Sequence, residues 1–230
     1  MSKLIYSIVF CLFMMTTSIR AQHVYYKSTK HYADRVGYFE KNPSVDSTKI
    51  VMLGNSLTEF GKDWNIRLGV TNSCNYGIMG DNARGILNRL CQITPYHPKA
   101  IFLMVGINDI YPKLSAKSLF GKCRSVIDSI RVQTPSSRLY VQSILPVNES
   151  FHRWKTLEGQ SEKIVKTNEL LKEYCANNGI TYIDVYSRLV IPGTTVLPRS
   201  LTADGLHVNE DGYAIWSKVL REYITKDKLE

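Results

Sequence analysis

The sequence predicts a three-layer α/β/α sandwich built around a five-stranded parallel sheet. Five short apolar runs, each bounded by turn residues, are typical of strands that are buried on both faces. Segments with helical periodicity separate these runs, and such alternation favours a parallel sheet with right-handed crossovers. The chain of 230 residues is 44% hydrophobic and 21% charged. This is enough for one globular domain with its own core, and no linker-like stretch divides it.

The expected elements follow one another along the chain. Strands are predicted at residues 49–53, 69–74, 100–105, 138–145 and 180–185. Helices are predicted at residues 82–93, 115–133, 158–178 and 209–226, with a lead-in helix around 30–41. Asn177, Asn178 and Gly179 form a typical helix stop directly before the fifth strand.

The N-terminus has the pattern of a secretory signal. Lys3 supplies a basic start, an apolar run of about a dozen residues follows, and Ala21 is a small residue at the expected cleavage position. We therefore predict a signal peptide at 1–21 and a single domain at 22–230, whose first part, 22–48, is a lead-in segment. The protein is expected to be exported, either periplasmic or secreted.

Two other interpretations of the N-terminus stay open. The apolar run is shorter than the roughly 20 residues of a membrane-spanning helix, but it could act as an uncleaved anchor. Lipid attachment at Cys11 is weaker, because the bulky Phe10 stands where a small residue is expected. No other stretch is apolar enough to cross a membrane, so we expect no stable membrane insertion after cleavage.

The charge of the chain is positive but scattered. The formal net charge is +9, from 29 lysines and arginines and 20 aspartates and glutamates. The sequence has no arginine-rich helix and no RNA-binding motif of aromatic and basic residues. Solubility and weak attraction to anionic surfaces explain the charge, and nucleic acid is not an expected partner.

The cysteines do not indicate a metal site. Cys11 would leave with the signal, and the remaining cysteines are Cys74, Cys91, Cys123 and Cys175. They contain no CxxC pair, which disfavours zinc. In an exported protein, disulfides and buried free thiols are both open possibilities.

Polar residues that could take part in catalysis lie at one edge of the predicted sheet. In parallel sheets, ligands bind outside the carboxyl ends of the strands. Ser56 follows the first strand, the segment 77–81 follows the second, and the segment 106–109 follows the third. Asp204 and His207 follow the fifth strand at some distance, just before the last helix. The sequence therefore predicts a single site at this edge.

Ser56 and His207 are a candidate nucleophile and base. Ser56 would begin a helix, where free N–H groups favour negative charge, but a serine there is also an ordinary helix cap. A serine hydroxyl needs a base to take its proton, and histidine suits that role. His207 has Asp204 three residues earlier, where it can orient the imidazole ring. Thr58 replaces the second glycine of the G-x-S-x-G elbow, which disfavours an ordinary α/β-hydrolase.

The other histidines are weaker candidates. His23 and His31 precede the core, and His97 lies at the wrong end of the third strand. His152 lies in a loop and is a possible substrate contact.

Acyl transfer also needs donors for the developing oxyanion. The backbone N–H groups of Ser56 and Gly80 and the side chain of Asn108 are the candidates. Taken singly, Gly80 would more simply serve a tight turn, and Asn108 a turn hydrogen bond.

The order of these residues resembles the four sequence blocks of SGNH hydrolases, the GDSL-like esterases and lipases. The blocks are Gly54-x-Ser56, Gly80-Asp81, Gly106-x-Asn108-Asp109 and Asp204-x-x-His207, and the resemblance covers about residues 49–225. The segments around Gly80 and Asn108 look most similar to the branch of platelet-activating-factor acetylhydrolase subunits and bacterial carbohydrate acetylesterases.

This resemblance implies a flavodoxin-like sheet with Ser56, Asp204 and His207 as the catalytic triad. It implies an oxyanion hole made by Ser56, Gly80 and Asn108, and neither a metal nor an organic cofactor. One position departs from the family, because Asn55 stands where an aspartate usually precedes the serine.

The expected function is that of an exported serine esterase that removes short acyl groups, acetyl above all, from a small-molecule or glycan ester. Tyr76, Trp154 and Tyr111 could stack on a sugar ring, although aromatic residues more often pack in the core. Asn55 and Asp81 are further candidate substrate contacts. The alternatives are a lysophospholipase or thioesterase, and, in another class, a non-catalytic glycan-binding module on the same fold.

Overall fold

The computed structural model describes residues 29–230, so the predicted signal peptide lies outside the described residues. Its five strands are all parallel and lie in the order β2-β1-β3-β4-β5. The strands are β1 Ile50–Gly54, β2 Ser73–Gly77, β3 Ala100–Leu103, β4 Arg138–Gln142 and β5 Thr181–Ile183. This sheet confirms the predicted fold class.

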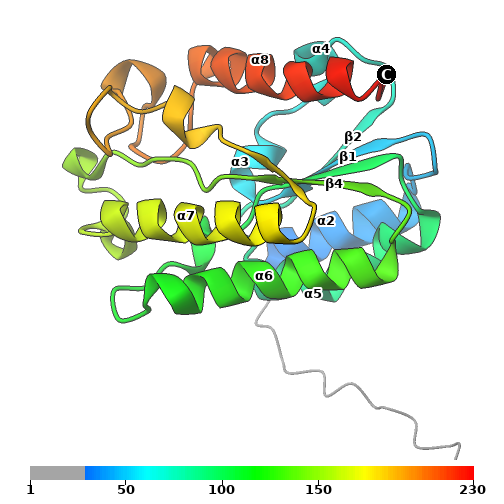
Figure 1. Cartoon of the computed structure of the whole chain (residues 1–230), viewed down its shortest axis with the longest axis horizontal. Helices are drawn as coiled ribbons and strands as arrows, with labels where there is room; N and C mark the ends of the chain where they lie inside the picture. The colour runs from blue at the N-terminus through cyan, green and yellow to red at the C-terminus, as the bar shows by residue number, and fades with distance from the viewer. Residues whose placement is uncertain (1–28) are drawn as a thin grey trace, which may run out of the picture.

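Helices cover both faces of the sheet. Figure 1 shows α4 and α8 on one face and α2, α5, α6 and α7 on the other. The helices are α2 Lys30–Lys41, α3 Ser56–Glu59, α4 Trp64–Leu68, α5 Ala83–Arg89, α6 Ala116–Gln133, α7 Ser161–Asn177 and α8 Glu210–Lys226. The lead-in helix expected around 30–41 is α2, and α7 ends at the predicted stop before Gly179, which has a φ of +65°.

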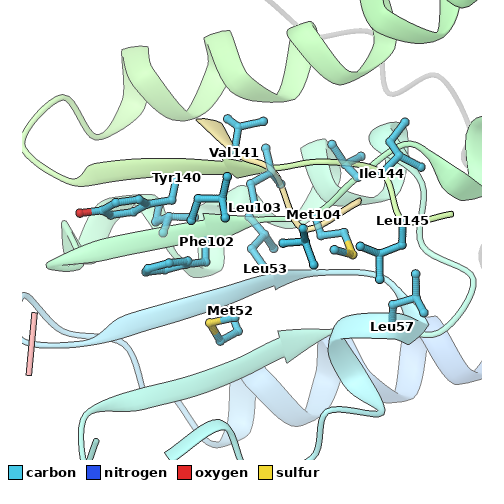
Figure 2. Packing of buried hydrophobic residues seen from close by; sticks show 14 of the residues in the cluster. Met52, Leu53, Leu57, Phe102, Leu103, Met104, Tyr140, Val141, Ile144 and Leu145 are labelled. Carbon is cyan, nitrogen blue, oxygen red and sulfur yellow. The ribbon is translucent and has the colours of Figure 1, made fainter. Parts of the chain in front are cut away.

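The core lies on both sides of the central strands. Every residue of β1 and β3 is buried, as the continuous apolar runs predict. Figure 2 shows side chains of β1, β3 and β4 packed together, and the rings of Phe102 and Tyr140 stack with their centroids 4.4 Å apart. This packing fixes the strands whose carboxyl ends carry the candidate residues.

Two hydrogen bonds attach α8 to α3 and to the end of β4. Tyr213 donates its hydroxyl to the carbonyl of Leu57 at 2.7 Å, and Trp216 donates its indole N–H to the side-chain oxygen of Gln142 at 2.7 Å. All four residues are buried, and buried polar groups of this kind are costly to leave unpaired. These bonds fix the first turns of α8, and with them the end of the preceding loop, relative to α3 and β4.

The second strand begins later than the sequence predicted. Residues 69–72 are not part of the strand, because Gly69 ends an unpredicted helix, α4, with a φ of +71°. Asp63 caps α4 by accepting the N–H of Asn65, and Trp64 and Leu68 bury one face of it. Helix α4 has only five residues, little more than one turn, so no periodic pattern marks it.

Several other elements are shorter than predicted, and β3 and β5 each end two residues earlier than expected, at Leu103 and Ile183. The helix expected at 82–93 ends at Arg89 and continues as 3-10 turns. The strand expected at 138–145 ends at Gln142. Beyond it, Ser143 accepts the N–H of Val185, and the amide of Ile144 donates to the side chain of Asn168. The backbone N–H of Ser143 still donates to the carbonyl of Ile183 in β5, and from Ile144 on a side chain replaces the neighbouring strand as the hydrogen-bond partner.

The four cysteines of the described residues are free thiols and form no disulfide with one another. Cys123 and Cys175 are buried, and Cys91 is exposed. None of the helices within residues 29–230 combines the length and the apolarity needed to cross a bilayer.

Candidate active site

Ser56 is the first residue of α3, immediately beyond the end of β1. Asn55 caps the helix, since its side-chain oxygen accepts the N–H of Leu57 at 2.9 Å. A Cβ atom on Gly54 would lie 2.2 Å from the hydroxyl oxygen of Thr58 and 2.8 Å from the carbonyl oxygen of Met104. The sharp turn from strand to helix therefore needs a glycine at position 54.

His207 bridges Ser56 and Asp204. Its Nε2 lies 3.0 Å from the Oγ of Ser56, and its Nδ1 lies 2.7 Å from the Oδ2 of Asp204. An ionised carboxylate only accepts hydrogen bonds, so Nδ1 carries the proton in the neutral ring. Nε2 is then the acceptor of the Ser56 hydroxyl proton. The residues predicted to meet from distant parts of the chain do lie in contact.

The loop before α8 holds Asp204 and His207 in this arrangement. The Oδ1 of Asp204 accepts the backbone N–H of Leu206 at 2.9 Å and that of His207 at 2.8 Å. Thr202 closes the loop by donating its hydroxyl to the carbonyl of His207 at 2.8 Å. Two residues three apart can therefore face each other without belonging to a helix.

These contacts keep Asp204 charged. Burial by itself raises the pKa of Asp204, but the hydrogen bonds from the His207 ring and from the amides of Leu206 and His207 outweigh it. The pKa of this carboxyl consequently lies below its ordinary value. A charged Asp204 is suited to stabilising an imidazolium on His207.

Gly80 and Asn108 lie on the loops that flank Ser56. These loops follow β2 and β3, which are the neighbours of β1 on either side. The side chain of Asn108 donates to the carbonyl of Asp81 at 2.8 Å, which joins the two loops. Gly80 has a φ of +78°, a conformation that favours glycine.

The backbone N–H groups of Gly80 and Ser56 are available as donors. Within residues 29–230, the N–H of Ile78 donates to Gly54, that of Met79 to Glu59 and that of Asp81 to Ile78. The N–H of Gly80 has no such acceptor among the described residues. The N–H of Ser56 has no intrahelical acceptor, because Ser56 is the first residue of its helix.

A buried ion pair between Arg89 and Asp81 lies beneath the loops that flank Ser56. Arg89 donates its Nε to Asp81 at 2.8 Å and its Nη2 to the carbonyl of Gly54 at 3.0 Å. Both side chains are at most 1% exposed. Burial raises the pKa of Asp81 to about 6, although the Arg89 guanidinium counteracts the shift. The pair connects the turn before Ser56 with the loop of Gly80.

Three residues that were predicted to contact the substrate are buried, so the prediction is wrong for them. Asp81 is turned toward Arg89, and Asn55 is 1% exposed and caps α3. Tyr76 is 1% exposed and stacks on Phe39 with ring centroids 4.2 Å apart. All three side chains therefore support the site from the interior, and Tyr76 has no free face for a sugar.

Trp154 lies at the site itself. Its indole N–H donates to the carbonyl of Asp204 at 3.1 Å, and its ring centroid is 5.5 Å from that of His207. The ring of Phe60 approaches His207 from another direction, with centroids 5.1 Å apart. Half-buried Trp154 thus holds the catalytic loop and also borders the space around His207.

Tyr111 and His152 are exposed. Tyr111 is 52% exposed and follows Asn108 by three residues. His152 lies 3.3 Å from the carboxylate of Glu158, and its side chain is 78% exposed. Neither residue has a contact with Ser56 or His207 within the described part of the chain.

Sequence patterns did not identify Phe60, Arg89 or Glu59 as part of this edge. Phe60 follows Ser56 by four residues, which places it one helical turn away, and this spacing is a signal that was present. Glu59 follows Ser56 by three residues, which is also one helical turn, but a charged residue in a helix is usually solvated. Arg89 carried no spacing signal.

The structure resembles solved structures of acylhydrolases. A protein from Streptococcus pneumoniae described as a platelet activating factor is 25% identical, with a TM-score of 0.70 over 85% of this chain and 91% of that one. A protein from Bacteroides fragilis that is described as an acylhydrolase is 21% identical, with a TM-score of 0.72 over 89% of this chain and 100% of that one. An acetyl-xylooligosaccharide esterase from Geobacillus is 16% identical, with a TM-score of 0.58 over 79% and 96%.

A sheet of this order, with a serine, a histidine and an aspartate in hydrogen-bond contact at its carboxyl edge, defines a serine hydrolase type of site. Residues 50–215 match the GDSL-like lipase/acylhydrolase family, and the chain belongs to this family of ester hydrolases. Its substrate is accordingly an ester. No curated protein matches the chain.

The lowered pKa of Asp204 predicts how stability depends on pH. Its stabilising contribution is complete above the ordinary aspartate pKa and is lost as the pH falls through the lowered pKa of the folded state. Asp204→Asn should therefore flatten the fall in the free energy of unfolding between about pH 5 and pH 2. Urea unfolding of both proteins at a series of pH values measures this, and equal slopes would contradict the prediction.

Proposed function

We propose that the protein is an exported serine esterase that removes short acyl groups from carbohydrate esters. Ser56 is the nucleophile, His207 the general base and Asp204 the group that orients His207. The observation that carries this proposal is the continuous chain of contacts from Asp204 through His207 to Ser56, at 2.7 Å and 3.0 Å. The 3.0 Å contact between Ser56 and His207 is within the range in which a proton can be transferred, and the 2.7 Å contact with Asp204 orients the imidazole ring.

The reaction follows from this geometry. His207 takes the hydroxyl proton of Ser56 while the Oγ attacks the ester carbonyl carbon. The N–H groups of Ser56 and Gly80 and the side chain of Asn108 donate to the resulting oxyanion. His207 returns the proton to the alcohol as the acyl–oxygen bond breaks. His207 then takes a proton from a water molecule that attacks the acyl carbon, and it returns this proton to the Oγ of Ser56 as the acid leaves.

Ser56→Ala should abolish this chemistry and leave the fold intact. We expect kcat/KM for p-nitrophenyl acetate to fall about 10³-fold or more, because no attacking oxygen is left. A fluorophosphonate probe should add to Ser56 in the unmodified protein and not in the variant, as intact mass shows. Unchanged hydrolysis in Ser56→Ala would refute the assignment. A folded wild-type protein that neither hydrolyses esters nor reacts with the probe would instead be a binding module.

A carbohydrate ester is favoured by the half-buried ring beside His207. Trp154 is held by its hydrogen bond to Asp204 and by its contact with His207, so it is a rigid platform of the kind that stacks on sugar rings. The Geobacillus esterase, which shares the fold, is described as acting on acetyl-xylooligosaccharide.

A lipid or thioester substrate is the second candidate, and a different observation favours it. Phe60, Met79 and Tyr111 are 38%, 44% and 52% exposed. Phe60 contacts His207, Met79 precedes Gly80, and Tyr111 lies just beyond Asn108. Apolar side chains on all three segments could accommodate a longer acyl chain.

A substrate series separates these two candidates. With p-nitrophenyl acetate, butyrate and octanoate, we expect kcat/KM to be at least about 10-fold higher for acetate than for octanoate. Acetylated xylose oligosaccharides should be better substrates than acetylated simple alcohols. If kcat/KM rises with chain length and the acetylated sugars are not hydrolysed, the lipid or thioester candidate is correct and the carbohydrate proposal is wrong.

Export rests on the N-terminal residues alone. The basic start, the apolar run and Ala21 are the support for cleavage between Ala21 and Gln22. When the full chain is made in a Gram-negative bacterial host, we expect it in the periplasm or medium with Gln22 as its first residue. Intact mass and cell fractionation measure both. A full-length protein retained in the membrane would show that the segment is an anchor, and one in the cytoplasm would refute export.

A further inference from the structure

Glu59 links the helix of the nucleophile to the loop of Gly80. It is the last residue of α3, three residues after Ser56, and its side chain is 16% exposed. Its Oε2 accepts the backbone N–H of Met79 at 2.5 Å. Hydrogen bonds to charged groups are among the strong ones, so this contact fixes the peptide group that precedes the Met79–Gly80 peptide.

Two residues of α2 hold the Glu59 carboxylate from the other side. The Nε2 of His31 lies 3.0 Å from each oxygen of Glu59, and the Nε of Arg35 lies 3.4 Å from Oε1. Arg35 also donates to the carbonyl of Gly77 at 3.2 Å, at the end of β2. Helix α2 lies before residues 50–215, so this support comes from outside the segment that matches the family.

The loop of Gly80 needs support on this side. Met79 and Gly80 are exposed, and the left-handed conformation of Gly80 is not enforced by crowding, because a Cβ there would meet no atom within 4 Å. At the other end of the loop, Arg89 and Asn108 both hold Asp81. Glu59 is the corresponding contact at Met79, and together they determine where the Gly80 N–H points.

We propose that Glu59 is a positioning residue for the Gly80 amide, and that His31 and Arg35 of α2 keep its carboxylate in place. The inference rests on the proposed function, in which the Gly80 N–H donates to the oxyanion. Glu59 does not touch the substrate. It acts through the Met79 peptide, so its loss should weaken transition-state stabilisation more than substrate binding.

The test compares Glu59→Ala with Glu59→Gln. Alanine removes the acceptor, and glutamine keeps a side-chain oxygen that can accept the Met79 N–H. With p-nitrophenyl acetate we expect Glu59→Ala to lower kcat about 10- to 100-fold, with KM changed by less than about threefold. Glu59→Gln should recover most of that loss. Lys30→Ala, which breaks the exposed Lys30–Asp34 pair on the same helix, is the matched control and should keep the wild-type kcat.

His31→Ala is the second variant, and it keeps the proposal testable if Glu59→Ala does not fold. The His31 side chain is 36% exposed, so its removal should leave the fold intact and lower kcat about threefold or more. Melting temperatures of all variants show whether a change in kcat is a change in folding.

The possible results separate this inference from the proposed function. Wild-type kcat in folded Glu59→Ala, or in folded His31→Ala where Glu59→Ala does not fold, would overturn the positioning role. An equal loss of kcat in Glu59→Ala and Glu59→Gln would overturn the hydrogen-bond explanation. Ester hydrolysis that persists in Ser56→Ala would overturn the proposed function instead, whatever the Glu59 variants do.

Discussion

The close approach of α3 to the carboxyl ends of β1 and β2 is the constraint on which the site depends. A Cβ on Gly54 would collide with Thr58, and a Cβ on Gly77 would lie 2.2 Å from the backbone nitrogen of Glu59. Two glycines therefore let a helix begin directly on the sheet. This places Ser56 at the first helical position, where its N–H is free and its hydroxyl faces the loop before α8.

The buried Arg89–Asp81 pair fixes the positions of the loops around Ser56. Arg89 binds Asp81 and the carbonyl of Gly54, and so ties the loop after β2 to the turn before Ser56. Asp81 pays a desolvation cost there, which raises its pKa to about 6 despite the cation. Buried pairs of this kind add little net stability, but a pair that is broken is costly. The benefit of this pair is a fixed position for the two loops around Ser56.

The sequence predicted the fold from its buried strands, and it predicted the contact between Ser56, His207 and Asp204 from their places after the strands together with the resemblance to SGNH hydrolases. Buried strands appear as continuous apolar runs, and the order of a parallel sheet brings residues after different strands to one edge. The supporting residues could not be predicted this way. Glu59 and Arg89 lie in helices as ordinary charged residues, and only the packing around them shows that they are paired. Tyr76 was misjudged for the same reason, since burial depends on Phe39, a distant residue.

Asn55 caps α3 at the position where the family usually has an aspartate. Its side-chain oxygen accepts the Leu57 N–H, and an aspartate oxygen would do the same, so the change from the usual aspartate keeps the helix cap. Asn55 differs in being neutral. It is 1% exposed and adjacent to Ser56, and a carboxylate in that position would add a further poorly solvated negative charge to an edge that already holds Asp81 and Asp109. Because acyl transfer builds a further negative charge on the substrate oxygen, a neutral cap beside Ser56 is compatible with the chemistry. The departure from the family pattern therefore leaves the serine site intact.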